Sequence, residues 1–295
     1  TDPNKVTPPT TRAIALVRPP GHHAAGHNRD DRYDAQGFCY LNNVAIAAKH
    51  AIASRRASRV FIMDWDIHHG NGTQDLTYDD KNIFYFSIHR AFYPYTGQYD
   101  ETGSGDAVGT NCNVMWDFGG MGNAEYAEVF QYLVLPAIMS FGPDLILVSS
   151  GFDAAEGDSL GDCCLTPAMY YAMTNSLLAT AGPDVPMVVV LEGGYNLDVI
   201  ADCAEGIALA LLNQPWKEDT TEYESQTFWS TKSILPVTSS QVLQQSNPFG
   251  LDRWLKKRPF HVRNKHTTMQ EEHALWNIKR SAHALHKAEC TIHRR

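Results

Sequence analysis

The apolar positions of the chain gather in short runs that are separated by longer segments of mixed polarity. Five of these runs are rich in β-branched or other apolar residues, which is typical of strands buried on both faces of a sheet. They are AIALV (13–17), RVFIM (59–63), IFYFSI (83–88), LILVSS (145–150) and MVVVLE (187–192). Helical patterns lie between most of them, at 41–54, 123–140, 166–182 and 197–212. This alternation predicts an α/β fold, an open parallel sheet flanked by helices on both faces.

Polar residues mark the ends of two of these helices. Asn42 or Asn43 is a plausible N-cap of the first helix, because a short polar side chain there can accept a hydrogen bond from a free backbone N–H group. In the segment 166–182, Thr166 is the expected N-cap, Pro167 is the first helical residue and Gly182 ends the helix.

Four polar clusters directly follow four of the predicted strands. They are RPPGHHA (18–24), DWDIHHGNGTQ (64–74), GFDAAEGD (151–158) and GGYN (193–196). In an open α/β sheet, ligands bind outside the carboxyl ends of the strands. The four loops are therefore expected to converge on one site at that edge of the sheet.

The charge of the chain divides it into two parts near Asn213. Residues 1–212 contain 11 basic and 25 acidic residues, whereas residues 213–295 contain 13 basic and 8 acidic ones. We expect a globular domain over 1–212 and a basic extension over 213–295. The acidic body can attract cationic substrates such as lysine-rich protein segments, although a solvated acidic surface explains the same composition.

The end of the basic extension predicts an amphipathic helix around 270–292. Its apolar residues are spaced three or four apart and form one stripe; they are Leu275, Ile278, Ala282, Leu285 and Ala288. We expect this helix to pack on its own domain. A surface for a protein partner or for self-association is the alternative. The basic charge by itself does not establish nucleic-acid binding.

Composition excludes several classes of protein. No apolar run approaches the roughly 20 residues that span a bilayer, and the start TDPNKVTPPTTR lacks the apolar core of a signal peptide. The six cysteines include no C-x-x-C pair, so neither a disulfide framework nor a cysteine zinc finger is indicated. We expect a soluble intracellular protein, in the nucleus or the cytoplasm. The glycosylation sequon Asn71-Gly72-Thr73 is then a chance match.

The residue types in the four loops favour metal chemistry. Asp66 and His68 are two residues apart, so in an extended chain both side chains leave on one side and can bind the same ion. With Asp153 they make a nitrogen and oxygen set that suits zinc or a harder divalent metal. His22 and His23 are suited to general acid–base catalysis, and Tyr195 can present a phenol to the same site. Structural roles, as caps of turns or as a core aromatic, are the alternatives.

Two other active sites have less support from the sequence. The glycine pairs Gly70-x-Gly72 and Gly103-x-Gly105 lack the full glycine fingerprint and the lysine of a phosphate-binding loop. No serine lies in a nucleophile elbow, so a serine triad is not indicated.

Six motifs together resemble one family, the zinc-dependent histone deacetylases of class II. They are RPPGHHA, GFCYLNNVAIAAKH (37–50), DWDIHHGNGTQ, SIHR (87–90), LVSSGFDAAEGD (147–158) and LEGGYNL (191–197), and they occur in the family's order over roughly residues 13–212. The resemblance implies an arginase-like fold, one catalytic zinc ion and usually one or two potassium ions. It also implies hydrolysis of N-ε-acetyl-lysine in histones or other proteins, so acetylated proteins or peptides, possibly histone tails, are the expected partners.

The resemblance also implies a role for individual residues. The zinc ligands would be Asp66, His68 and Asp153, and the catalytic residues would be His22, His23 and Tyr195. Asp64 would orient His22, and Asn71 would orient His23. The acyl-lysine channel would be formed by Gly37, Phe38, Tyr93 and Leu160. The nearer potassium ion would be bound by Ser87 and by backbone oxygens of Asp64, Asp66, His68 and Ile88.

Some residues depart from the family pattern or narrow it. Tyr195 resembles the tyrosine-containing, class IIb-like branch, and Leu160 stands where the polyamine-preferring relative has a glutamate. Tyr93 replaces the usual phenylalanine, and residues 24–36 form a charged insert beside the channel. Only about seventeen residues precede RPPGHHA, so an N-terminal part of the family domain, with its substrate-binding rim loop, is expected to be missing.

Two other functions compete with deacetylation. An acetyl-lysine-binding scaffold would need no complete acid–base set. An arginase-like enzyme with two manganese ions would need additional bridging carboxylates.

Overall fold

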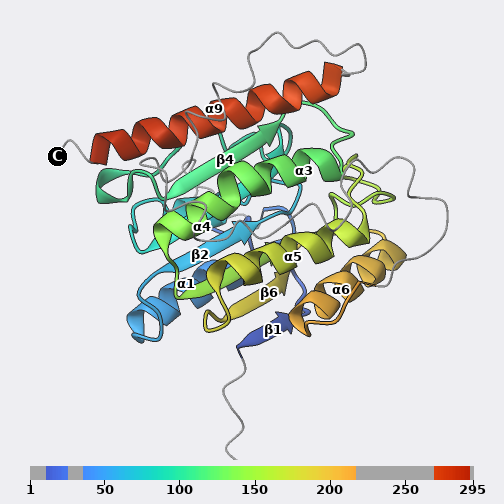
Figure 1. Cartoon of the computed structure of the whole chain (residues 1–295), viewed down its shortest axis with the longest axis horizontal. Coiled ribbons are helices and arrows are strands. Elements are labelled where there is room, and N and C mark those ends of the chain that lie inside the picture. The colour runs from blue at the N-terminus through green and yellow to red at the C-terminus, as the bar shows by residue number, and fades with distance from the viewer. Residues whose placement is uncertain (1–10, 26–35, 217–268, 293–295) are drawn as a thin grey trace, which may run out of the picture.

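Six parallel strands form the sheet at the centre of the fold. The structure is a computed structural model that describes residues 11–25, 36–216 and 269–292. The strand order is β1-β6-β5-β2-β3-β4 (Figure 1). The strands are β1 (Arg12–Ala15), β2 (Val60–Asp64), β3 (Ile83–Arg90), β4 (Asn111–Trp116), β5 (Leu145–Ser150) and β6 (Met187–Leu191). The five strands predicted from apolar runs are thus confirmed.

Strand β4 has no counterpart among the predicted strands. Its sequence NCNVMW has asparagines at the first and third positions, which interrupt the apolar pattern, yet both side chains are buried. The Nδ2 groups of Asn111 and Asn113 donate hydrogen bonds of 3.0 and 2.8 Å to Oε1 of Gln74, so these donors are satisfied inside the protein. A long-range partner therefore makes this polar strand compatible with burial.

Helices cover both faces of the sheet (Figure 1). They are α1 (Asn43–Ala53), α2 (Asn71–Thr77), α3 (Asn123–Val129), α4 (Leu135–Phe141), α5 (Pro167–Ala181), α6 (Leu197–Leu211) and α9 (Met269–Ile292), with a 3₁₀ turn at Gly105–Ala107. The smaller core cluster lies under α1, and the larger one lies on the side of α3, α4 and α5. The predicted architecture is confirmed.

Two of the predicted helices differ in detail. The segment 123–140 is interrupted by a π-helical turn, Phe130–Val134, just before Pro136, whose missing N–H group removes one α-helical hydrogen bond. Asn42 caps α1 by accepting a hydrogen bond of 2.9 Å from the N–H group of Ala45. Thr166 stands before α5 as predicted, but its hydroxyl accepts a hydrogen bond from Asn123 instead of capping its own helix.

The C-terminal helix α9 packs on β4 and α3 of the same chain. Its described buried residues follow helical spacing; they are Ala274, Asn277, Ile278, Ser281, Ala282 and Leu285. Asn277 also donates a hydrogen bond of 3.1 Å to Asp117. The side chains of Leu275 and Ala288, predicted for the same stripe, lie outside the described residues, as do residues 217–268. The domain boundary near Asn213 therefore stays a prediction.

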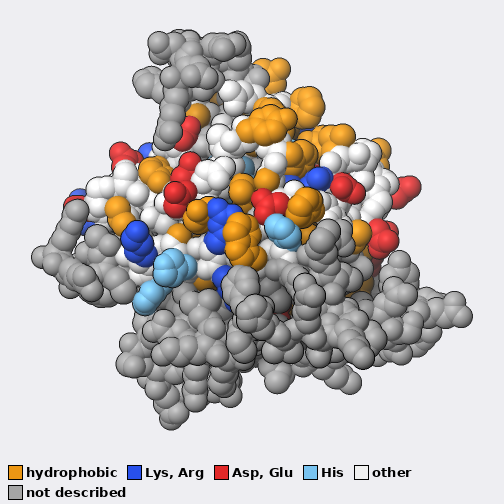
Figure 2. All heavy atoms as spheres, turned by 90° about the horizontal axis from the view of Figure 1, so that it is seen from above, with side chains coloured by type: hydrophobic (Ala, Val, Ile, Leu, Met, Phe, Trp, Pro, Cys, Tyr) orange, Lys and Arg blue, Asp and Glu red, His pale blue; other side chains and the backbone are white. Residues whose placement is uncertain are grey.

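The outer side of α9 mixes basic, aromatic and histidine side chains. Figure 2 looks down on this side of the molecule, where basic and histidine side chains lie next to apolar ones. The guanidinium group of Arg280 lies 3.7 Å from the ring centre of Tyr99 and 4.1 Å from that of Trp276. This stacking adds an aromatic contact to the apolar packing of the helix.

We expect Leu285→Ala to lower the free energy of unfolding by about 2–5 kcal/mol, because truncating a buried leucine loses apolar contact and leaves a cavity. Leu285 is 1% exposed and belongs to the larger core cluster. Urea unfolding of the whole chain, followed by tryptophan fluorescence, measures the change. His283→Ala, on the exposed side of α9, is the matched control. Equal stability of the two variants would contradict the packing of α9 on the domain.

Within the described residues, α9 and the other helices are too short or too polar to cross a bilayer.

Candidate active site

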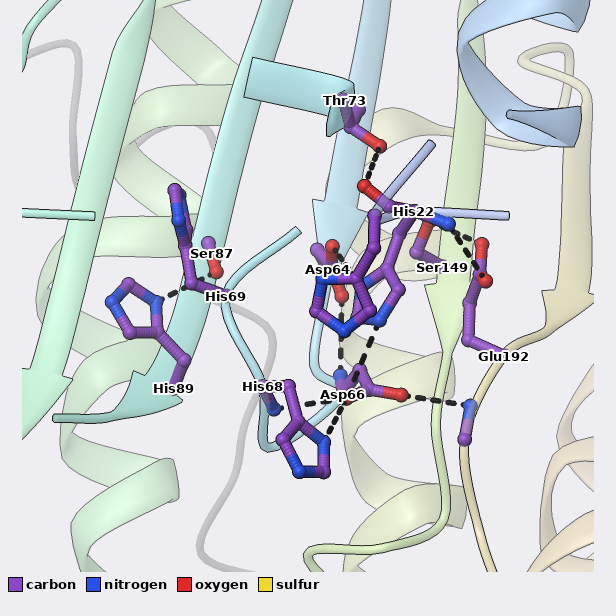
Figure 3. A network of polar contacts seen from close by, with 12 residues as sticks. His22, Asp64, Asp66, His68, His69, Thr73, Ser87, His89, Ser149 and Glu192 are labelled. Atoms are coloured by element: carbon purple, nitrogen blue, oxygen red, sulfur yellow. Dashed lines mark hydrogen bonds and ion pairs between the residues drawn. The ribbon is translucent and has the colours of Figure 1, made fainter. Parts of the chain in front are cut away.

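The carboxyl ends of four parallel strands bring the candidate site residues together. Asp64 ends β2, and Asp66 and His68 follow it before α2 begins. His22 and His23 come after β1, Asp153 after β5 and Tyr195 after β6. Figure 3 shows His22, Asp64, Asp66 and His68 gathered at this edge. The predicted convergence of the four loops is confirmed.

Three of these side chains form a group that could hold a metal ion. One ligand atom from each of Asp66, His68 and Asp153 lies within 4.8 Å of the other two. Nδ1 of His68 lies 3.1 Å from Oδ1 of Asp66 and 3.0 Å from Oδ2 of Asp153. The two carboxylates are fully buried, and His68 is 8% exposed.

The electrostatics of this group favour a bound cation. Burial, with the negative charge of Asp66, raises the pKa of Asp153 to about 6. Burial alone would lower the pKa of His68, but its hydrogen bonds to Asp153 and Asp66 raise it to about 10. Two buried carboxylates thus stabilise positive charge at this point, and a divalent metal would take the place of the imidazole proton. The nitrogen and oxygen donors fit zinc, and a metal ligand set is what the sequence predicts.

Backbone groups fix the orientation of both carboxylates. The N–H group of Gly193 donates a hydrogen bond of 2.7 Å to Oδ2 of Asp66, and that of Ile67 donates one of 3.0 Å to Oδ1 of Asp153. A Cβ atom at Gly193 would collide with the carboxylates of Asp66 and Asp153. The first glycine of GGYN is therefore required for this close approach.

The tandem histidines have different partners. Nδ1 of His22 lies 3.2 Å from Oδ2 of Asp64, and Nδ1 of His23 lies 2.9 Å from Oδ1 of Asn71. Because an amide oxygen only accepts hydrogen bonds, Nδ1 of His23 carries the hydrogen, and its Nε2 keeps a lone pair. Both pairs are those that the family resemblance implies.

Their pKa values diverge in the same way. Burial alone would lower the pKa of His22, but the charges of Asp66 and Asp64 raise it well above its ordinary value. Burial and the charge of His22 lower the pKa of His23 to about 3. The centres of the two rings lie 4.0 Å apart. The imidazole of His22 thus favours its protonated form, next to a neutral imidazole of His23.

Glu192 supports the histidine loop and is not predicted from the sequence. Its Oε2 accepts hydrogen bonds of 2.7 and 3.1 Å from the N–H groups of Gly21 and His22, and its Oε1 accepts one of 3.1 Å from Ser149 (Figure 3). Burial raises the pKa of this carboxyl group to about 7. Its signal in the sequence is a single acidic residue at the end of the apolar run MVVVLE.

A backbone hydrogen bond holds Tyr195 in the loop that follows β6. Its N–H group donates a hydrogen bond of 2.7 Å to Asp158. Burial, followed by the charges of Asp66 and Asp153, raises the pKa of its phenol well above the ordinary value. The hydroxyl therefore stays protonated at neutral pH.

The predicted channel residues lie around the same site. The ring of Phe38 is 6.2 Å from that of Tyr195, and the ring of Tyr93 is 5.3 Å from that of His23. Phe38 and Leu160 are 66% and 47% exposed. A Cβ atom at Gly37, whose φ is +53°, would collide with the ring of His23. Contact of these residues with a substrate stays a prediction.

The predicted potassium residues are adjacent in the sheet. Asp64 is the partner of Ser87 in the pairing of β2 with β3, and both are buried. The hydroxyl of Ser87 lies 2.8 Å from Nδ1 of His89. Binding of potassium by Ser87 and by backbone oxygens of Asp64, Asp66, His68 and Ile88 stays a prediction.

Comparison with known proteins gives a consistent set of relatives. A family model described as histone deacetylase domain matches residues 4–211. The chain is 48% identical over 211 residues to histone deacetylase HDA1 of Saccharomyces cerevisiae, which covers 69% of this chain and 29% of that protein. It is 43% identical over 233 residues to histone deacetylase 15 of Arabidopsis thaliana, which covers 78% of this chain and 41% of that protein. The matched part thus spans less than half the length of these relatives.

Solved structures agree. The crystal structure of the HDA15 HD domain matches with 46% identity and a TM-score of 0.63, over 70% of this chain and 57% of that chain. The structure of the histone deacetylase Clr3 matches with 42% identity and a TM-score of 0.62, over 72% of this chain and 34% of that chain.

Proposed function

This chain belongs to the histone deacetylase family, and from that premise we propose that it is a zinc-dependent hydrolase that removes acetyl groups from lysine side chains of proteins. The observation that carries the proposal is the buried group of Asp66, His68 and Asp153 beside a neutral His23. One ion fits this group, since it offers three donors within the described residues. A zinc ion held there would supply polarisation of the acyl carbonyl and would lower the pKa of a nearby water toward roughly 7.

The histidines would transfer the protons of the reaction, and Tyr195 would stabilise the developing negative charge. Nε2 of His23 accepts the proton as water attacks the carbonyl carbon, because its Nδ1 is already committed to Asn71. The phenol of Tyr195 donates a hydrogen bond to the carbonyl oxygen as negative charge develops there. A proton returned from His23 or His22 to the departing nitrogen then releases lysine and acetate.

The side chains around the opening supply specificity in this proposal. Phe38, Tyr93 and Gly37 would contact the apolar stem of the acyl-lysine side chain, and Leu160 would lie at its rim. The phenol at position 195 supports our proposal that the enzyme is similar to the tyrosine-containing branch of the family. Leu160 is an apolar side chain, which offers no charge to bind a polyamine substrate.

The wider setting of the enzyme belongs to the same proposal. Acetylated proteins, histone tails among them, are the proposed substrates, inside the cell. Potassium would bind near Ser87 to hold the metal loop. Residues 1–212 would form the catalytic domain and 213–295 an extension.

The experiment that tests the function compares zinc-loaded with metal-stripped protein on an acetyl-lysine peptide and a trifluoroacetyl-lysine peptide. We expect zinc-dependent release of lysine from both substrates. Because a ligand that binds the folded state stabilises it, zinc at 100 times its Kd should also add about 2.7 kcal/mol to the free energy of unfolding. Chelation should therefore lower the melting temperature. Zinc-loaded protein that binds the peptides without hydrolysing either would favour the scaffold function instead.

A further inference from the structure

Arg90 joins two loops on the outer side of the metal site. It is the last residue of β3 and of the motif SIHR, and its side chain is mostly buried. Its Nη1 donates a hydrogen bond of 2.9 Å to the carbonyl oxygen of Gly161, and its Nη2 lies 3.6 Å from Oδ2 of Asp162. Its Cζ lies 4.7 Å from the ring centre of Phe92. The planar guanidinium group thus contacts both loops at once.

On one side, Arg90 supports the loop that carries Tyr93. The ring of Phe92 packs on the ring of His68 with their centres 4.8 Å apart, and Tyr93 follows it directly in the chain. The ring of Tyr93 also lies 6.2 Å from that of His68. Because Phe92 is held between Arg90 and His68, the backbone of Tyr93, the next residue, is held in position as well.

On the other side, Arg90 supports the loop that carries Leu160. Gly161 packs so closely on the backbone carbonyl of Asp153 that a Cβ atom there would collide with it. Asp162 adopts a positive φ of 50°, so the chain turns sharply at the point where Arg90 contacts it. The position of Leu160 is therefore set by contacts of the two residues that follow it.

We propose that Arg90 is a positioning residue that fixes Tyr93 and Leu160 relative to each other and so sets how tightly the channel binds the stem of the acyl-lysine side chain. The inference rests on the proposed deacetylase function. Arginine is required because its rigid fork can donate to a carbonyl oxygen, face a carboxylate and stack on an aromatic ring together, whereas lysine offers a single point charge.

The test measures kcat and KM for matched acetyl-lysine and trifluoroacetyl-lysine peptides with wild type, Arg90→Ala and Arg90→Lys. We expect Arg90→Ala to raise KM for the acetyl peptide about tenfold with kcat within about threefold of wild type, because substrate binding is lost rather than transition-state stabilisation. KM for the trifluoroacetyl peptide should rise by a similar factor, because the two substrates share the lysine stem. Arg90→Lys should resemble Arg90→Ala, because lysine cannot make the three contacts together. Bound zinc should be unchanged.

Arg56→Ala is the matched control, since Arg56 is an exposed arginine between α1 and β2, at the edge of the sheet where the parallel strands begin. Unchanged KM for both peptides in both Arg90 variants would overturn the inference. A fall in kcat that follows loss of zinc would also overturn it, because Arg90 would then support the metal group alone. If Arg90→Ala does not fold, Arg90→Lys gives the same comparison. If wild type hydrolyses neither peptide, the proposed function fails, and the affinities of wild type and Arg90→Lys for the acetyl peptide, from fluorescence anisotropy, still test the inference.

Discussion

Replacing His23 by alanine should lower kcat for an acetyl-lysine peptide by about 10²–10⁴-fold, which is the usual contribution of a general acid–base group. The reason lies in the environment of the imidazole. Burial and the neighbouring His22 lower its pKa to about 3, so that it is neutral at pH 7. Its Nδ1 faces the side-chain oxygen of Asn71 at 2.9 Å, which leaves Nε2 as the basic nitrogen.

The measurement is single-turnover hydrolysis with zinc content determined on the same samples. Zinc should remain bound, because His23 is not one of the three grouped donors. His50→Ala, which removes an exposed histidine from α1, is the matched control and should retain wild-type kcat. Wild-type turnover by the His23→Ala variant would refute the assignment of the base.

Tyr195→Phe should lower kcat for the acetyl-lysine peptide by about 10²–10³-fold, as expected for the loss of one preorganised donor to a developing oxyanion. The pKa of the phenol is raised by burial and by Asp66 and Asp153, so the hydroxyl is a donor at neutral pH and not a competing anion. Phenylalanine keeps the ring beside Phe38 and removes the hydroxyl alone. KM should therefore change little.

A trifluoroacetyl-lysine peptide separates this role from simple packing. Its carbonyl is activated already, so the Tyr195→Phe variant should lose less activity on it than on the acetyl peptide. Tyr40→Phe removes a hydroxyl from a tyrosine that is 72% exposed, and it should behave as wild type on both substrates. Equal losses on the two peptides would argue that Tyr195 positions the substrate and does not stabilise the oxyanion.

The strands that the sequence predicts are those whose burial is visible in composition. Apolar runs such as MVVVLE are stable only when they are buried in a core. They therefore predict buried strands and the order of those strands along the chain. Strand β4 is different, because the buried Asn111 and Asn113 donate hydrogen bonds to Gln74 of α2 and to backbone carbonyls of Glu101 and Gln98, which lie in other parts of the chain. Helix α2 is not predicted either, because the polar residues of its first turn belong to the motif DWDIHHGNGTQ.

The residues of the site also differ in whether the sequence alone predicts them. Asp66, His68 and Asp153 can be predicted because each follows a strand and each has a residue type with a metal-binding use. Glu192 cannot, because its function depends on hydrogen bonds from two backbone N–H groups that lie about 170 residues away in the chain. Arg90 is visible as part of SIHR, but its bridge between two loops is a property of the folded chain.

The packing around Asn71 also determines how the protein should be produced. Asn71 faces His23, and Thr73 is buried, with its N–H group donating to the carbonyl oxygen of His22. In the folded protein, an oligosaccharide on Asn71 would displace these contacts. A secretory host, however, attaches glycans to the sequon while the chain is still unfolded. Expression through a secretory pathway should therefore trap misassembled, glycosylated protein, whereas expression in a bacterial cytosol leaves Asn71 unmodified and its contact with His23 intact.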